Sequence, residues 1–289
     1  MKPEHLTTKI FLDGGDPSET KDMIATLGFL DGQTTNPTLI SKNPEARQRL
    51  ARSEKFTKKE VYSFYRDVVE RISILIPHGS VSVEVYADDK TSAREMIAQG
   101  KEMYAWIPNA HIKLPITSEG LRAAEEMVKE GMRVNLTLCF SQAQAAAVYA
   151  ATRGATPGQV FISPFIGRLD DVHVRGLDLI EHIARMHQAG DGHVQLLAAS
   201  IRTLDHMQSS FAHGADIITV PSSILQEWAA VGMPLTPPKA ESRDTTDTLA
   251  PLEWHTLDLD ADWTSFDISH PLTTKGIERF AADWNALIE

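Results

Sequence analysis

The stretch HIKLPITSEGLRAAEEMVKEGMRVNLTL (111–138) contains the pattern of one strand, one helix and a second strand. The runs at 111–115 and 133–138 are short and alternate apolar with polar residues, which predicts two β-strands. Between them, Thr117 and Ser118 stand directly before acidic and apolar residues, a pattern typical of a helix start. Strand, helix and strand in this order form a unit of a parallel sheet, so this stretch predicts an α/β protein.

Eight strand-like runs occur along the chain, separated by segments with helical periodicity or composition. They span residues 9–13, 31–35, 81–86, 111–115, 133–138, 159–163, 194–200 and 216–220. A length of 289 residues is typical of an α/β barrel that forms one domain. We therefore predict a single (β/α)₈ TIM barrel over residues 1–289, with extra helices and loops near both termini.

Several segments add to this repeat. Residues 41–80 are too long for one helix and predict two, and Ser18, followed by acidic residues, predicts the start of the first helix. Residues 234–264 are rich in Pro, Thr and Asp and predict an extended surface segment, followed by a C-terminal helix at 270–288. The alternative is a linker to a second domain, but too little chain follows to build one.

The composition argues against several classes of function. The 28 basic and 39 acidic residues give a net charge of −11 without a basic cluster, so we expect neither nucleic acid nor an anionic membrane as partner. The single cysteine, Cys139, cannot form an intramolecular disulfide, and no stretch reaches the ~20 apolar residues that span a bilayer, so we expect a cytoplasmic protein. Because no HExxH, GxGxxG or GxxxxGK[ST] motif occurs, we expect no metal and no nucleotide cofactor.

Polar residues occupy one face of several predicted strands. In HIKLP, Ile112 and Leu114 share one face and Lys113 lies on the other, because alternate side chains of a strand point in opposite directions. A sheet with one solvated face would alternate in the same way, but a parallel sheet covered by helices has no such face. The polar residues then point into the barrel near its carboxyl-terminal end, where active sites of such barrels lie. Those residues are Asp13, Glu84, Lys113, Asn135 and Thr137.

These groups suit carbonyl chemistry. Burial favours the free amine of a lysine, which attacks a carbonyl carbon, and the resulting iminium allows a carbon–carbon bond of a bound sugar to break. Asp13, and Glu84 with Thr137, are suited to carry the protons. From the pattern alone, other roles remain open: Lys113 can equally extend to solvent, Asp13 is more often a turn or helix-cap residue, and Glu84 is more often part of an ion pair.

Motifs in chain order resemble those of the transaldolase family. TTNPTLI (34–40) resembles the family signature after the second strand, and IKLPITSEG (112–120) resembles the segment with the imine-forming lysine. Further matches are VEV around Glu84, VNLTLCFS (134–141), ISPFIGR (162–168), LAASIR (197–202) and HPLTTKGIERFAADW (270–284). Together they extend from the first strand to the last helix. The resemblance implies a barrel with the lysine on its fourth strand.

The resemblance also implies an activity: transfer of a dihydroxyacetone unit from fructose 6-phosphate or sedoheptulose 7-phosphate to erythrose 4-phosphate or glyceraldehyde 3-phosphate, in the pentose phosphate pathway. It implies Lys113 as the nucleophile, Asp13 as the acid and base of carbon–carbon cleavage, and Glu84 with Thr137 as a water-linked proton relay. The implied binding residues are Asn36, Asn135 and Ser163 for hydroxyls, Phe165 beside the intermediate, and Arg168, Ser200 and Arg202 for the phosphate. It implies no cofactor, and we expect a homo-oligomer.

Two alternatives share most of these residues. Related aldolases that cleave fructose 6-phosphate outright tend to carry glutamine in place of Glu84 and tyrosine in place of Phe165, so this chain favours transfer. A barrel that only binds sugar phosphates would not need Lys113 beside two carboxylates. The chain also departs from the family pattern at Gly14, where many relatives have threonine, and at Gln33, where a small or aliphatic residue is usual. Gln33 stands close before Asn36 and therefore bears on the shape of the sugar site.

Overall fold

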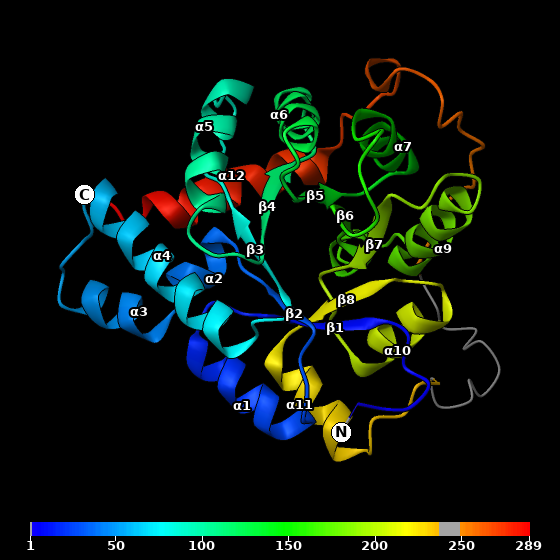
Figure 1. Ribbon diagram of the computed structural model, residues 1–289. Helices are drawn as coiled ribbons and strands as arrows, with labels where there is room; N and C mark the ends of the chain where they lie inside the picture. Colours follow the sequence, from blue (N-terminus) through cyan, green and yellow to red (C-terminus); the bar gives the residue numbers. More distant parts are fainter. Residues whose placement is uncertain (1, 237–248) are drawn as a thin grey trace.

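The computed structural model describes residues 2–236 and 249–289, in which eight parallel strands form a closed barrel (Figure 1). The strands follow one another around the barrel in chain order, and the first pairs with the last. They are β1 (Lys9–Asp13), β2 (Gly32–Thr34), β3 (Ser80–Glu84), β4 (Ala110–Pro115), β5 (Val134–Cys139), β6 (Val160–Pro164), β7 (Val194–Ala198) and β8 (Ile217–Val220). The predicted (β/α)₈ barrel is confirmed, and each predicted strand overlaps an observed one.

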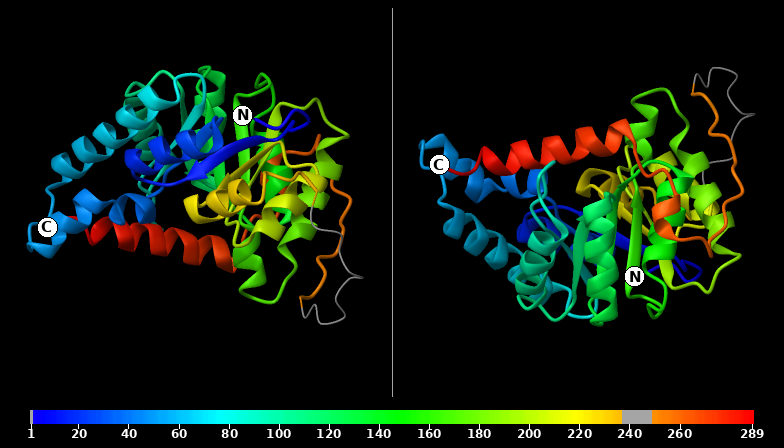
Figure 2. Two further views of the ribbon diagram at one scale, coloured as in Figure 1. Left: turned by 90° about the horizontal axis from the view of Figure 1, so that it is seen from below. Right: turned by 90° about the horizontal axis from the view of Figure 1, so that it is seen from above.

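Helices follow the strands and surround the barrel (Figure 1). They are α1 (Pro17–Leu27), α2 (Pro37–Ser41), α3 (Pro44–Ala51), α4 (Lys58–Leu75), α5 (Ala93–Tyr104), α6 (Ser118–Lys129), α7 (Gln142–Ala151), α8 (Ile166–Asp170), α9 (Gly176–His187), α10 (Leu204–Ala212), α11 (Ser222–Ala230), the short 3₁₀ helix η1 (Trp263–Ser265) and α12 (Pro271–Asn285). The two helices predicted within 41–80 are α3 and α4. The long helix α12 packs against α2 and β5, and Figure 2 shows it running along one side of the molecule.

The first helix begins earlier than predicted. Asp16, not Ser18, is its N-cap, because the Asp16 side chain accepts a hydrogen bond from Ser18 N, and Pro17 occupies the first turn. Asp and Pro at these two positions are a favourable helix start, and the serine that follows is already inside the helix.

The predicted alternation of inward and outward faces is confirmed. Ile112 faces the helices, since a Cβ added to Gly100 of α5 would lie 3.1 Å from its Cγ2 atom. Inside the barrel, the ring of Phe161 lies 6.1 Å from Phe11 and stacks 3.9 Å from His111, centroid to centroid. Side chains from β1, β4 and β6 can meet only along the barrel axis, so these rings fill the centre of the barrel.

The segment predicted to be extended, 234–264, lies partly outside the described residues, at 237–248. Its later part runs beside α7 and α9: Leu252 N donates to Asp178, the side chain of Gln142 donates to Glu253 O, and η1 packs on α7. Within 2–236 and 249–289, no helix that could span a membrane is found.

Gln144 joins α12 to the barrel. The side chain is fully buried, and its oxygen accepts a hydrogen bond from Phe140 N at 2.7 Å. Its Nε2 atom donates to Ile268 O at 3.0 Å and to Thr273 Oγ1 at 2.8 Å. Thr273 Oγ1 in turn donates to Leu138 O at 2.9 Å. One amide group therefore connects the end of β5 with the first turn of α12.

Replacing Gln144 by leucine is expected to lower the free energy of unfolding by about 3 kcal/mol, because Phe140 N and Ile268 O lose their buried partner. Urea unfolding followed by circular dichroism measures this change. The matched control is Gln48→Leu on the exposed face of α3, which should change stability by less than about 0.5 kcal/mol. Equal effects of the two substitutions would contradict the role given to Gln144.

Candidate active site

A cavity of about 460 Å³ opens at the carboxyl-terminal ends of the strands, where barrels of this type carry their active sites. The loops after β2, β6, β7 and β8 and the helix α12 contribute to its wall. Of the predicted site residues, it is lined by Asp13, Asn36, Lys113, Ser163, Phe165, Arg168, Ser200 and Arg202. The remaining three, Glu84, Asn135 and Thr137, are not part of its lining.

A buried ion pair includes the candidate nucleophile. Lys113 Nζ lies 3.0 Å from Glu84 Oε2, and the two side chains are 3% and 4% exposed. The sheet dictates this pairing, because Glu84 on β3 and Lys113 on β4 are register partners. Burial raises the pKa of the Glu84 carboxyl above its ordinary value, and the positive charge of Lys113 acts against this shift. The ion pair that the sequence left open for Glu84 is therefore present.

Asp13, at the end of β1, lines the same cavity. Its Oδ1 atom accepts a hydrogen bond from Thr34 Oγ1 at 2.7 Å, and the Thr34 hydroxyl lies 2.6 Å from that of Thr219. Burial raises the pKa of the Asp13 carboxyl, and the charge of Lys113 and the hydrogen bond from Thr34 partly oppose the rise. Both carboxyl groups of the site thus hold a proton more readily than an exposed carboxyl does.

Asn135 lies behind the cavity wall. Its Oδ1 atom accepts a hydrogen bond from Ser163 Oγ at 2.7 Å, and its Nδ2 atom donates to Ser82 Oγ at 3.0 Å. Asn135 therefore orients the hydroxyl of Ser163, which does line the cavity. Thr137 is also buried, and its Oγ1 atom has no hydrogen-bond partner in the part of the chain that the structure describes.

Asn36 has a structural role as well as a place in the cavity. It is the N-cap of α2, and its Oδ1 atom accepts a hydrogen bond from Leu39 N at 2.9 Å. Pro37 occupies the first turn of that helix, so the TNP sequence fixes the local backbone. With the oxygen engaged, the Nδ2 group of Asn36 is the donor left for a ligand.

Gly14 and Gln33, the two positions at which the chain departs from the family pattern, are joined by a hydrogen bond outside the cavity. Gln33 is fully buried, and its oxygen accepts a hydrogen bond from Thr20 Oγ1 on α1 at 2.7 Å. Its Nε2 atom donates to Gly14 O at 2.8 Å. Gln33 thus connects β1, β2 and α1, and it does not line the cavity.

Arginine side chains form the outer part of the cavity. The guanidinium of Arg168 lies 5.1 Å from the ring centroid of Phe165 and 5.3 Å from that of Phe280. Arg202 is more exposed, and its Nη2 atom lies 2.9 Å from Asp171 Oδ2. Ser200, which also lines the cavity, has a φ of +61°, a left-handed conformation that is strained for a residue with a side chain. Planar guanidinium groups held in this way suit a phosphate or a carboxylate.

Among the lining residues that the sequence analysis missed are two cations, Lys42 and Arg279, and the aromatic Phe280. Lys42 follows α2, and the other two lie on α12, which a hydrogen bond from Thr38 of α2 to Asp283 holds in place. The C-terminal motif was recognised, but helical periodicity does not reveal which surface a helix will cover. With Lys42 and Arg279, five cationic side chains line the cavity, although the chain as a whole has a net charge of −11. This local concentration of positive charge favours anionic ligands.

The fold and this cavity define a (β/α)₈ barrel whose polar, cation-lined site lies at the position used by barrel enzymes. A family model described as transaldolase/fructose-6-phosphate aldolase matches residues 10–289. The chain belongs to this family, as the motif resemblance predicted.

Curated relatives extend over nearly the whole chain. A protein of Dehalococcoides mccartyi named "probable transaldolase" is 34% identical over 279 residues, covering 96% of this chain and 99% of that protein. One of the same name from Paracoccus denitrificans is 36% identical over 276 residues, covering 96% of each chain. Another from Halalkalibacterium halodurans is 35% identical over 277 residues, covering 96% of this chain and 99% of the relative.

Gly276 of α12 has no side chain and therefore leaves room for the guanidinium group of Arg168. A Cβ at Gly276 would lie 2.8 Å from Arg168 Nη1 and 2.6 Å from Leu138 Cδ2. Gly276→Ala is therefore expected to displace the guanidinium and to weaken the binding of inorganic phosphate about tenfold, measured by calorimetric titration. Since alanine favours helix, loss of α12 would not explain the effect. The neighbouring exposed substitution Thr274→Ala should leave phosphate affinity unchanged, and an unchanged affinity in Gly276→Ala would refute the role of this glycine.

Proposed function

We propose that this protein is a transaldolase that transfers a dihydroxyacetone unit between sugar phosphates through an imine on Lys113. The donors are fructose 6-phosphate and sedoheptulose 7-phosphate, and the acceptors are erythrose 4-phosphate and glyceraldehyde 3-phosphate, as in the pentose phosphate pathway. The observation that carries the proposal is the buried pair of Lys113 and Glu84, 3.0 Å apart, at a cavity that also contains Asp13 and a group of arginines. Family membership supports the same activity.

In the first step, the free amine of Lys113 attacks the ketone carbon of the donor. Glu84 is suited to take the ammonium proton beforehand, because burial favours its protonated form. The carbinolamine then loses water to give the iminium. Glu84 and Thr137, whose hydroxyl has no hydrogen-bond partner among the described residues, would hold the water that carries these protons.

In the second step, Asp13 takes the proton from the hydroxyl on the fourth carbon of the donor. The bond between the third and fourth carbons breaks, its electron pair moves into the iminium to form an enamine, and an aldehyde leaves. The acceptor aldehyde then binds, the enamine attacks its carbonyl carbon, and Asp13 returns the proton to the new hydroxyl. Hydrolysis of the new iminium releases the product ketose and restores Lys113.

The outer residues would hold the substrate. Arg168 and Arg202, with Ser200, suit the terminal phosphate of donor and acceptor alike. Asn36 and Ser163 would hold sugar hydroxyls, and Asn135 would orient Ser163 from behind. Phe165 packs beside Lys113, whose nitrogen lies 5.8 Å from the ring centroid.

Two alternatives are an aldolase that releases dihydroxyacetone and a barrel that binds sugar phosphates without catalysis. Release requires protonation of the enamine. Phe165 supplies no proton at this position, which favours transfer. Against the binding-only alternative, a buried lysine paired with a carboxylate is costly, and the arginines of the cavity suit a phosphate without it.

The imine is tested by borohydride reduction in the presence of fructose 6-phosphate, with intact mass as readout. We expect a ketose-derived adduct on the wild-type protein and none on Lys113→Ala, whose transfer rate should fall about a thousandfold or more. Lys42→Ala, which removes another lysine of the same cavity, should keep the adduct. Absence of the ketose-derived adduct on the wild type, or its presence on Lys113→Ala, would contradict the proposed mechanism.

Transfer and aldol cleavage are distinguished by coupled assays of glyceraldehyde 3-phosphate release with and without erythrose 4-phosphate. A transaldolase needs the acceptor for turnover, so the rate with acceptor should be the higher. Phe165→Tyr, which adds a hydroxyl proton donor near the enamine, should raise the acceptor-free rate up to about a hundredfold, whereas Phe165→Leu should not. Equal rates with and without acceptor in the wild type would favour the aldolase.

A further inference from the structure

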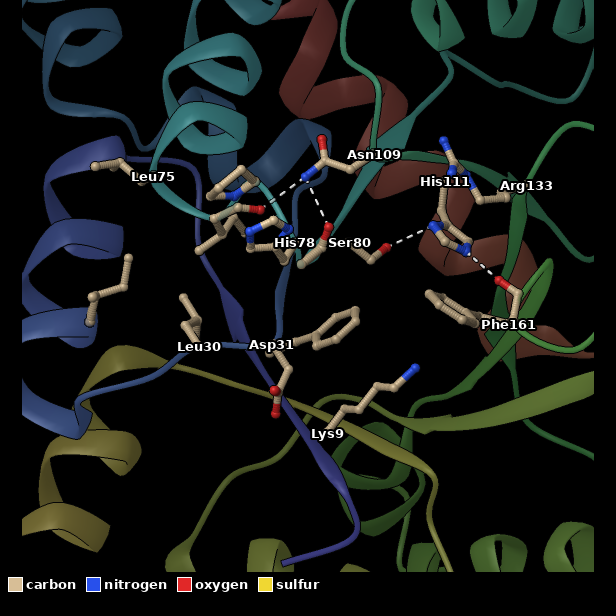
Figure 3. A pocket seen from close by; sticks show the side chains of 16 residues that line it. Lys9, Leu30, Asp31, Leu75, His78, Ser80, Asn109, His111, Arg133 and Phe161 are labelled. Atoms are coloured by element: carbon tan, nitrogen blue, oxygen red, sulfur yellow. Dashed lines mark hydrogen bonds between the residues drawn. The ribbon is translucent and has the colours of Figure 1, made fainter. Parts of the chain in front are cut away.

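A second cavity lies at the opposite, amino-terminal end of the barrel (Figure 3). Its volume is about 490 Å³, within the range of small-molecule sites. The starts of β1, β3 and β4 and the end of α4 contribute to its lining. None of the residues given a role in transfer lines it, and we refer to it as the lower cavity.

The inner wall of the lower cavity is a fixed aromatic surface. His111 stacks on Phe161, with Phe11 beside them, and all three rings line the cavity. Both nitrogens of His111 are engaged, one 2.7 Å from Ser80 Oγ and the other 3.0 Å from Gly158 O. Burial lowers the pKa of His111 to about 3, so the ring is neutral at physiological pH. The three rings are almost inaccessible, at 0% exposure for Phe11, 2% for Phe161 and 5% for His111, so they form a closed, uncharged floor of the cavity.

The remaining wall has an apolar side and a cationic side. Figure 3 shows Leu30 and Leu75 on one side; on the other, the amino group of Lys9 lies below and Arg133 above, with His111 and Phe161 between them in this view. Ile24 and Ile76 also line the cavity. A ligand that filled this space would contact aliphatic groups at one end and two cations at the other.

Neither cation forms an ion pair with a described residue, although the Lys9 charge acts on the carboxyl of Asp216, whose pKa burial raises and Lys9 lowers. Arg133 donates to two backbone carbonyls, Ala110 O at 2.9 Å and Pro108 O at 2.6 Å, and Lys9 Nζ forms neither a hydrogen bond nor an ion pair with any described residue. Asp31, the acidic residue of the lining, is already neutralised, since Lys2 Nζ lies 2.8 Å from its Oδ2 atom. Two cations without an ion-pair partner among the described residues therefore line a space that also has aliphatic and neutral polar groups in its wall.

We propose that the lower cavity binds a small organic carboxylate with an apolar body. The carboxylate would interact with Lys9, with Arg133 as a second cation of the same wall, and the body would contact Leu30 and Leu75. Inorganic phosphate has no apolar body to fill the space, and a neutral ligand leaves both cations without a counter-charge. This inference does not rest on the proposed transfer activity, because it involves another cavity and needs no sugar.

The probe is 4-fluorobenzoate, observed by fluorine NMR on the full-length protein without substrate. We expect saturable binding with a Kd of about 1 mM or tighter. Lys9→Met should weaken it about fivefold to tenfold, because a charge-assisted contact is lost at an exposed side chain whose removal does not disturb the fold. Arg133→Lys, which keeps the charge but loses the planar fork, should weaken it less than Arg133→Met. The exposed control Lys59→Met should bind as the wild type does.

The location is tested against the upper cavity, whose arginines also attract anions. Binding of 4-fluorobenzoate should persist in Arg168→Met and in the presence of saturating inorganic phosphate, and 4-fluorobenzyl alcohol should bind more weakly than the carboxylate. If Arg168→Met or phosphate abolishes binding while Lys9→Met leaves it intact, the probe occupies the upper cavity and the proposal is wrong. Absence of saturable binding to the wild type would also overturn it.

Discussion

The burial of one lysine and two carboxyl groups inside a closed barrel is the constraint on which the rest of the structure depends. Lys113 and Glu84 are almost inaccessible to solvent, and removing their charges from water is costly unless each compensates the other. The folded-state pKa values of Asp13 and Glu84 lie above their ordinary values of 3.8 and 4.5. These carboxyls therefore favour folding below those pH values, and their contribution is lost as the pH rises through the raised pKa values. At neutral pH the aliphatic core between barrel and helices has to offset this cost.

The arrangement around that pair divides the barrel interior into layers. On β1, β4 and β6, the aromatic residues Phe11, His111 and Phe161 are each followed two positions later by a polar one, Asp13, Lys113 or Ser163. Because side chains repeat their direction every two residues, each polar group stands directly above a ring. The rings close the lower side of the polar cavity. They therefore leave the carboxyl-terminal end of the strands as the open end of this cavity.

The alternation of side chains along each strand predicted which polar residues point into the barrel. Where this prediction of the site was incomplete, the reason is physical. Parity placed Asp13, Glu84 and Lys113 inside the barrel, because a closed sheet leaves only two directions for a side chain. Parity did not reveal that Asn135 lies behind Ser163, since depth within the interior depends on partners from other strands. Lys42, Arg279 and Phe280 were missed because they reach the cavity through the docking of α2 and α12, a tertiary contact without a local sequence signal. Ser18 was misassigned because Asp16 and Pro17 together make the stronger helix start.

Because α12 lies at the end of the chain, closure of the barrel and covering of Arg168 can occur at different times during synthesis. Barrel closure needs only the strands up to β8, which ends at Val220, whereas the cover over Arg168 is supplied by Phe280 and Gly276 much later. Chains emerge from the ribosome with their earlier segments first. During synthesis the eight strands can therefore close before α12 covers Arg168, so the barrel forms before its cation-lined cavity is complete.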